Sequence, residues 1–184
     1  CRALYGDSKG LAGILGTGSN TCYYDGLQVA NKTFSMGYIL GDEGSANHFG
    51  RLWLKQYLTN RVPKKLERLF QDSCSISKET WIYRIYHEPG ANRLIASVAP
   101  FLSQNKSHPF LHSLIINSLT EYFEQQVIDL AKGLNEEERK ISFVGSVAEA
   151  FQEEVKTVAN RFNISVGKII QSPIESLVNY HKKK

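Results

Sequence analysis

A glycine-rich segment at the end of an apolar run constrains the fold of this chain more than any other feature. Residues 11–15 are Leu-Ala-Gly-Ile-Leu, residues 16–20 are Gly-Thr-Gly-Ser-Asn, and residues 21–25 are Thr-Cys-Tyr-Tyr-Asp. A strand that breaks at two glycines and returns as a strand predicts a tight hairpin. Because glycine lacks a Cβ, consecutive N–H groups in such a turn can converge on an anion. The candidate phosphate-binding residues are therefore Gly16, Thr17, Gly18, Ser19 and Asn20. Taken alone, the segment favours the alternative, an ordinary hairpin turn.

The order of the other elements predicts an α/β fold with a mixed sheet. Strands are expected at 11–16, 20–25, 28–34, 141–144 and 164–169, and helices at 43–60, 109–132, after 146 and from 172, with short helical pieces over 64–105. The first three strands follow one another through short turns, which predicts antiparallel pairing. The last two strands each precede a helix, which predicts a parallel portion of the sheet.

Composition limits the classes of partner. The 184 residues suffice for one domain with a sizeable core, and 42% are hydrophobic. The net charge of +4 lies partly in Lys182, Lys183 and Lys184, which we expect to form a solvated tail. No nucleic-acid motif and no run long enough to span a membrane accompany it, so we expect neither partner.

The three cysteines, Cys1, Cys22 and Cys74, are widely spaced and form no C-x-x-C motif. This spacing predicts free thiols, no zinc site and a reducing, cytoplasmic location. His108 and His112 are four residues apart, but no acidic residue accompanies them, so no metal site is predicted.

A second glycine-rich segment carries two adjacent carboxylates. It is Gly41-Asp42-Glu43-Gly44-Ser45, at the start of a predicted helix. The carboxylates could accept hydrogen bonds from sugar hydroxyls or hold Mg²⁺ through water. The equal alternative is helix capping by Asp42 or Ser45.

A third candidate lies where the strand at 141–144 meets a helix. The first N–H groups of that helix have no intrahelical partner and carry partial positive charge, so a nucleotide could use them. The alternative is a plain turn in which Ser146 caps the helix.

The three motifs in combination resemble one family. Gly-Thr-Gly-Ser-Asn at 16–20, Gly-Asp-Glu-Gly-Ser at 41–45, Phe-Val-Gly-Ser-Val-Ala at 143–148 and Ser-Pro-Ile-Glu-Ser-Leu at 172–177 resemble the BadF/BadG/BcrA/BcrD ATPases, and among these the N-acetylglucosamine kinases. These proteins belong to the actin-like sugar kinase superfamily. The resemblance implies that residues 1–184 form a C-terminal ribonuclease-H-like domain. It implies a mixed five-stranded sheet with helices on both faces and a helical insertion at about 62–108.

The resemblance also implies roles for individual residues. Phosphate contacts fall to residues 16–20, sugar contacts to Asp42, Gly37 and Glu43, and adenosine contacts to Gly145, Ser146 and Val147. The implied ligands are ATP, Mg²⁺ and a sugar, with a homodimer left open. The family's Asp-Gly-Gly-Gly-Thr loop does not occur in these residues, and Met36 stands where a sugar-contacting aromatic residue is common.

The implied function is ATP-dependent phosphorylation of a sugar, N-acetylglucosamine or a related amino sugar. The catalytic Asp base of the family normally lies a few residues before the stretch that matches residues 1–4. The N-terminal domain is therefore expected to be absent from this sequence, and the isolated chain is expected to be inactive. Two alternatives remain. One is an ATPase activator of a 2-hydroxyacyl-CoA dehydratase or benzoyl-CoA reductase, which the cysteine spacing disfavours. The other is a non-catalytic nucleotide- or sugar-binding regulator.

Overall fold

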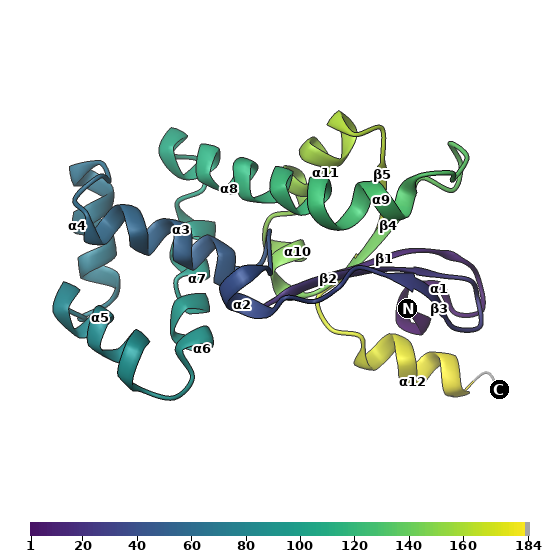
Figure 1. Ribbon diagram of the computed structural model, residues 1–184, viewed down its shortest axis with the longest axis horizontal. Helices are drawn as coiled ribbons and strands as arrows, with labels where there is room; N and C mark the ends of the chain where they lie inside the picture. Colours follow the sequence, from purple (N-terminus) through teal and green to yellow (C-terminus); the bar gives the residue numbers. More distant parts are fainter. Residues whose placement is uncertain (183–184) are drawn as a thin grey trace.

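The computed structural model describes residues 1–182, so Lys183 and Lys184 of the predicted tail lie outside the described residues. A mixed five-stranded sheet forms one end of the elongated molecule, and a group of helices forms the other (Figure 1). The strand order is β3-β2-β1-β4-β5. The strands are β1 (Gly10–Leu15), β2 (Ser19–Tyr24), β3 (Val29–Lys32), β4 (Lys140–Val144) and β5 (Ser165–Ile170).

Strand pairing follows the predicted division of the sheet. β1 and β2 pair antiparallel as a hairpin, and β2 pairs antiparallel with β3. β4 lies parallel to β1 and to β5. The mixed sheet with five strands is thus confirmed. The edge strand β3 is shorter than the predicted 28–34, and all four of its residues are exposed.

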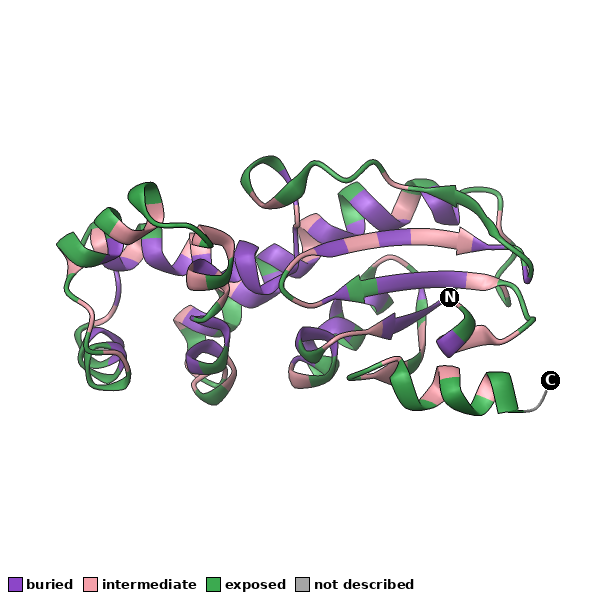
Figure 2. Ribbon diagram, turned by 90° about the horizontal axis from the view of Figure 1, so that it is seen from below, coloured by how far each residue is buried: buried purple, intermediate pink, exposed green. Residues whose placement is uncertain are grey.

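The two faces of the sheet carry different helices. Leu11 and Leu15 of β1 are fully buried, whereas Ile14 is 54% exposed, because side chains alternate between faces. A Cβ on Gly13 would collide with Tyr122, and a Cβ on Gly10 would collide with Tyr5, so helices approach both faces. Figure 1 shows α8, α9 and α11 on one side of the sheet, and α1 and α12 on the other. Figure 2 shows buried residues along the inner strands and mostly exposed ones along α12.

The helices described by the structure have the following bounds. They are α1 (Arg2–Tyr5), α2 (Gly37–Leu40), α3 (Ala46–Leu58), α4 (Lys64–Ser73), α5 (Lys78–His87), α6 (Ala91–Ala96), α7 (Ala99–Gln104), α8 (Pro109–Tyr122), the π-helical turn η1 (Phe123–Val127), α9 (Ile128–Ala131), α10 (Ser146–Ala150), α11 (Gln152–Arg161) and α12 (Ile174–Lys182). No helix within residues 1–182 is long and apolar enough to cross a membrane.

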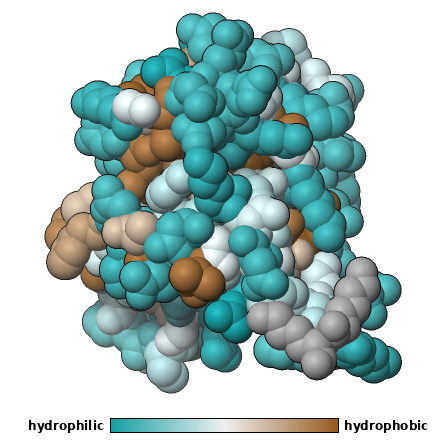
Figure 3. All heavy atoms as spheres, turned by 90° about the vertical axis from the view of Figure 1, so that its right-hand side faces the viewer, coloured by the Kyte–Doolittle hydropathy of each residue, from teal (hydrophilic) through white to brown (hydrophobic). Residues whose placement is uncertain are grey.

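Helices α4–α7 surround α3 in the helical end of the molecule, and α6 approaches the first half of α3, where a Cβ on Gly50 would meet the Ile95 backbone. Trp53 of α3 is fully buried, and its ring packs against those of Tyr57, Phe70 and Phe101 at centroid distances of 5.1–6.3 Å. This aromatic cluster gives the helical end its own apolar centre. The opposite end of the molecule, seen in Figure 3, is mainly hydrophilic with scattered apolar patches.

The predicted helix over 109–132 is continuous in direction but changes type. α8 passes into η1, and α9 completes the element. A π-helical turn inserts an extra residue, shifts the register of the side chains and is frequent at functional sites. Here the turn places Gln126 against the sheet, where Gln126 is only 8% exposed.

Candidate functional site

The hairpin tip at 16–18 is held by its carbonyl groups. The Ala46 N–H donates to the Gly16 carbonyl (2.9 Å), and the Thr17 carbonyl accepts from both the backbone N–H (3.1 Å) and Nδ2 (2.8 Å) of Asn47. The first amides of α3 are therefore already used. Within residues 1–182, the N–H groups of Thr17 and Gly18 donate to no protein acceptor. The tip thus presents free amides, which is the arrangement that suits an anion.

The acidic segment is joined directly to the hairpin. Asp42 adopts a positive φ of 60°, and its Oδ1 accepts a hydrogen bond from the Ser19 N–H at 3.2 Å. A Cβ on Gly18 would lie 2.7 Å from Asp42 Oδ2, so only glycine leaves room for the carboxylate. Of the two predicted caps, Ser45 caps α3, because its Oγ accepts from the His48 N–H (3.2 Å). The Asp42 carboxylate is not the cap of that helix.

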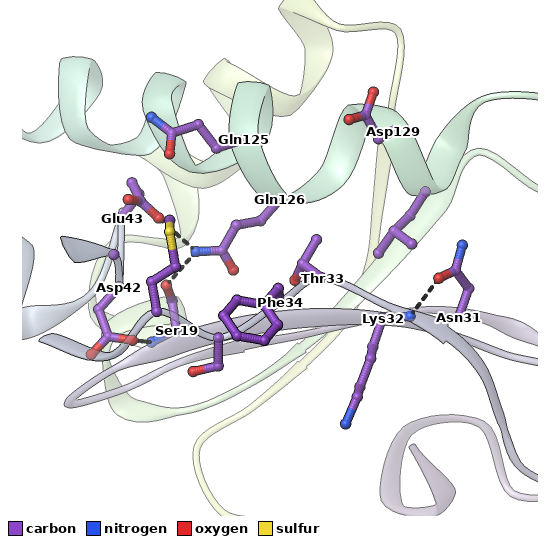
Figure 4. A pocket seen from close by; sticks show the side chains of 14 residues that line it. Ser19, Asn31, Lys32, Thr33, Phe34, Asp42, Glu43, Gln125, Gln126 and Asp129 are labelled. Carbon is purple, nitrogen blue, oxygen red and sulfur yellow. Dashed lines mark hydrogen bonds between the residues drawn. The ribbon is translucent and has the colours of Figure 1, made fainter.

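Asp42 and Glu43 line a pocket with a volume of about 400 Å³ (Figure 4). Glu43 is 6% exposed, and its Oε2 accepts a hydrogen bond from Gln126 Nε2 at 2.8 Å. The same Nε2 donates to Ser19 Oγ at 3.0 Å. The pocket therefore joins the hairpin, the acidic segment and η1. Gly37 is not part of its wall; it starts α2 and is exposed.

The strand–helix junction at 145–147 lies against the same hairpin. Gly145 has a φ of 134°, and a Cβ there would lie 2.1 Å from the Leu15 carbonyl oxygen and 3.2 Å from the Gly16 nitrogen. Gly145, not Ser146, is the N-cap of α10, and no side chain caps that helix. The predicted Ser146 cap is wrong, because the helix starts at Ser146 itself, one residue earlier than a cap at 146 requires. Ser146 is exposed, and Val147 is buried in the core.

Asn20 contributes to the sheet side of the hairpin. Its Oδ1 accepts from the Thr21 N–H (2.7 Å) and from the Thr33 hydroxyl (2.9 Å). The structure therefore brings the segments 16–20, 41–45 and 145–147 together at one end of the strands, although 99 residues or more separate the last segment from the others.

Sequence reasoning missed three residues that support this arrangement. They are Asn47, which holds the Thr17 carbonyl, Arg51, which donates to the carbonyls of Ile39 and Gly41, and Gln126. Asn47 Oδ1 and Gln126 Oε1 are buried without a hydrogen-bond partner among the described residues. Unsatisfied buried polar atoms are rare, and each calls for an explanation; Trp53 Nε1 and Trp81 Nε1, in the helical end, are unsatisfied as well. Of the three missed residues, only Asn47 could have been suspected from the sequence, because it lies in the first turn of the helix that follows the acidic segment.

His48 is a further residue that the sequence did not single out. Its Nδ1 accepts from the Gly44 N–H (3.3 Å) and contacts the Ser118 hydroxyl (2.7 Å), while its Nε2 lies 3.5 Å from Glu121. Burial, assisted by the charge of Arg51 and opposed by Glu43, lowers the pKa of His48 to about 4. The neutral imidazole therefore anchors Gly44, next to the acidic pair.

This burial makes the stability of the chain depend on pH. Below pH 6.5 the unfolded chain protonates His48, and the folded chain does so only near pH 4. The free energy of unfolding should therefore fall by about 2 kcal/mol as pH drops from 6.5 to 4, allowing for solvent screening. Urea titrations across this range measure the change.

His48→Gln is the matched control for this prediction. Burial, with the charges of Glu43 and Glu124, raises the pKa of Glu121, which acts in the opposite direction as pH falls. Subtracting the His48→Gln profile removes that contribution. Equal pH slopes in the two proteins would contradict the role assigned to His48.

Comparison with protein-family models and with curated proteins finds no match for this chain. Solved structures that share its fold include the following two. The first is a Porphyromonas gingivalis protein provisionally described as an N-acetylglucosamine kinase, with 35% identity and a TM-score of 0.93. The second, from Chromobacterium violaceum and described in the same way, has 17% identity and a TM-score of 0.71. The match to the first structure includes 100% of this chain and 63% of that protein. The match to the second includes 97% of this chain and 61% of that protein. The chain thus has the fold of proteins described as sugar kinases and spans less than two thirds of their length.

Proposed function

We propose that this chain is the nucleotide- and sugar-binding part of an ATP-dependent sugar kinase. In this proposal residues 1–184 form the C-terminal, ribonuclease-H-like domain of a two-domain protein of the BadF/BadG/BcrA/BcrD type, with its helical insertion at about 62–108. The observation that carries it is the hydrogen bond between Asp42 Oδ1 and the Ser19 N–H. That bond joins a hairpin with free amides to an acidic pocket, so an anion and a polyhydroxyl ligand can bind side by side.

The hairpin is assigned to the phosphates of ATP. The free N–H groups of Thr17 and Gly18 and the exposed Thr17 side chain suit phosphate oxygens, with Gly16 adjacent. Gly145 packs on this hairpin, so Gly145 and Ser146 are assigned to the adenosine side, and the buried Val147 side chain would support this junction from the core. Ser19 and Asn20 are bonded to Gln126 and Thr33, and they support the loop from behind.

The pocket is assigned to the sugar. The carboxylates of Asp42 and Glu43 accept hydrogen bonds from hydroxyl groups, and Phe34 offers an aromatic face in the same wall. An amino sugar such as N-acetylglucosamine is the preferred substrate. Gly37 lies outside the pocket wall, although its neighbour Met36 is part of that wall.

Mg²⁺ fits this site as a companion of the nucleotide. No group of three metal-ligating side chains occurs in the described part of the chain. Mg²⁺ usually keeps several waters and binds through one or two carboxylates together with substrate phosphates, and Asp42 is the carboxylate nearest the hairpin amides. When bound, the ion would neutralise charge on the phosphates.

The reaction divides between this chain and a second part. A sugar hydroxyl oxygen forms a bond to the γ-phosphorus, the bond from that phosphorus to the β-phosphate oxygen breaks, and the hydroxyl proton passes to a base. This chain would bind and orient both substrates. The resemblance assigns the base and the other phosphate loop to a preceding domain, so the 184 residues alone should show only background turnover.

The test of this function is ADP release by the full-length protein with N-acetylglucosamine, glucosamine, N-acetylmannosamine or glucose. We expect release that depends on an amino sugar and yields a phosphorylated sugar in equal amount. Sugar binding without turnover would instead indicate a regulator, and an oxygen-sensitive brown protein would indicate the dehydratase-activator alternative. No sugar binding and no turnover would refute the proposal.

A further inference from the structure

Two cysteines that are far apart in the sequence lie together on the face of the sheet that α1 and α12 cover, opposite to the face that α8 covers. Cys1 precedes α1, and Cys22 lies in β2, three residues after Ser19. Their sulfur atoms are 3.3 Å apart. Both residues are partly exposed and line an apolar groove of about 390 Å³ between the sheet, α1 and α12. A small reagent can therefore reach both thiols.

We infer that Cys1 and Cys22 form a reversible intramolecular disulfide when the protein meets a low-molecular-weight disulfide such as oxidised glutathione. The sulfur atoms must approach by about 1.2 Å to reach the bond length of about 2.05 Å. Neither sulfur makes another hydrogen bond within residues 1–182, so nothing holds the thiols apart.

The exchange balances with two molecules of reduced glutathione. One protein thiolate attacks oxidised glutathione, forms a mixed disulfide and releases one glutathione thiolate, which takes up a proton. The second protein thiol loses its proton and attacks the protein sulfur of the mixed disulfide, releasing the second glutathione. The protein loses two hydrogen atoms, and the oxidant gains them.

The surroundings of Cys22 set the conditions of the reaction. Burial raises the pKa of the Cys22 thiol, and Lys32, its register partner on β3, partly counteracts this. Oxidation is therefore best followed at mildly alkaline pH. Cys74 is an internal control, because burial also raises the pKa of its thiol, but its Sγ contacts the Phe70 carbonyl and no second thiol.

The disulfide would join α1 to the strand that carries the phosphate hairpin. Cys22 pairs with Ala12 in the β1–β2 ladder, and the hairpin tip at 16–18 connects these two strands. A cross-link here restrains the unfolded chain and also ties the start of the chain to β2. The inference does not depend on the proposed kinase function, because it concerns thiol chemistry alone.

The experiment treats the 184-residue chain with oxidised glutathione and follows mass, free thiols and melting temperature. We expect a monomer that is 2 Da lighter, a fall from three free thiols to one, and a peptide that joins Cys1 to Cys22. The melting temperature should rise and return to its starting value with dithiothreitol. Cys74→Ser should behave like the wild type, and Cys22→Ser should gain only a mixed disulfide.

Other products would overturn the inference. Stable glutathione adducts on Cys1 and Cys22 in the wild type would show that the second step does not occur. Disulfide-linked dimers, or a cross-link involving Cys74, would show that the two sulfurs are not neighbours in solution. Cys1→Ser provides a second variant in case Cys22→Ser fails to fold.

Discussion

Gly145→Ala is expected to destabilise the folded chain by about 4 kcal/mol. Its Cβ would lie 2.1 Å from the Leu15 carbonyl oxygen, and the backbone φ of 134° is unfavourable for any L side chain. Overpacking and backbone strain are each of order 1–3 kcal/mol, and here they add. Because the contact involves the backbone of β1 just before the hairpin, relief would require the strand to shift. Urea denaturation followed through the fluorescence of the buried Trp53 and Trp81 measures the loss.

Gly90→Ala is the matched control for the steric part of this effect. Gly90 also has a positive φ, of 83°, but nothing lies within 4 Å of a Cβ at that position. It should therefore lose only about 1–2 kcal/mol, from the left-handed backbone. If the two variants were equally stable, the packing of the 145–147 junction against the hairpin would not contribute to folding.

Asp42→Ala is expected to weaken sugar binding by the full-length protein about 100-fold, with a much smaller effect on ATP. A hydrogen bond to a charged group contributes about 1.5–3 kcal/mol, and each 1.4 kcal/mol is a factor of ten in affinity. The Ser19 N–H would also lose its acceptor. Isothermal titration with each ligand separately measures the two affinities. An unchanged sugar affinity would leave Asp42 with only a structural role.

Two further substitutions separate binding from positioning. Asp42→Asn retains an oxygen that can accept from Ser19 but removes the charge, so it should keep the fold and still lose sugar affinity. Gly18→Ala should displace the carboxylate, since its Cβ would lie 2.7 Å from Asp42 Oδ2. Gly16→Ala is its control in the same loop, because nothing lies within 4 Å of a Cβ at 16. If Gly16→Ala and Gly18→Ala reduced sugar affinity equally, displacement of Asp42 would not be the cause.

The strands and their directions could be predicted because their signals are local. The apolar run at 11–15, the glycines at 16 and 18 and the polar turn at 25–26 specify a hairpin within one stretch of chain. The helix over 109–132 was predicted in extent but not in its π-helical turn. That turn depends on the packing of Gln126 between Ser19 and Glu43, and periodicity along one segment carries no information about such a contact.

The candidate site divides in the same way. Residue type and spacing identified the segments 16–20, 41–45 and 145–147 as candidate binding segments. The structure gives a physical reason for glycine at 18 and 145, where a Cβ would collide with a neighbouring segment. Residue type and spacing did not indicate that Ser45 rather than Asp42 caps α3, or that Gly37 lies outside the pocket wall. The first outcome depends on the positive φ of Asp42, which turns its carboxylate toward Ser19. The second depends on where α2 lies relative to the pocket.

By itself, the sequence determined which segments form strands, where they turn and which short motifs have a backbone suited to anions and hydroxyl groups. Only the tertiary structure decided that these motifs adjoin, that Gln126 bridges two of them and that Cys1 reaches Cys22. The physical reason is that turn and strand preferences act over a few residues. These contacts instead require β4 to pair beside β1 and the α8–η1 element to cross the hairpin, and the packing of the whole core sets that arrangement.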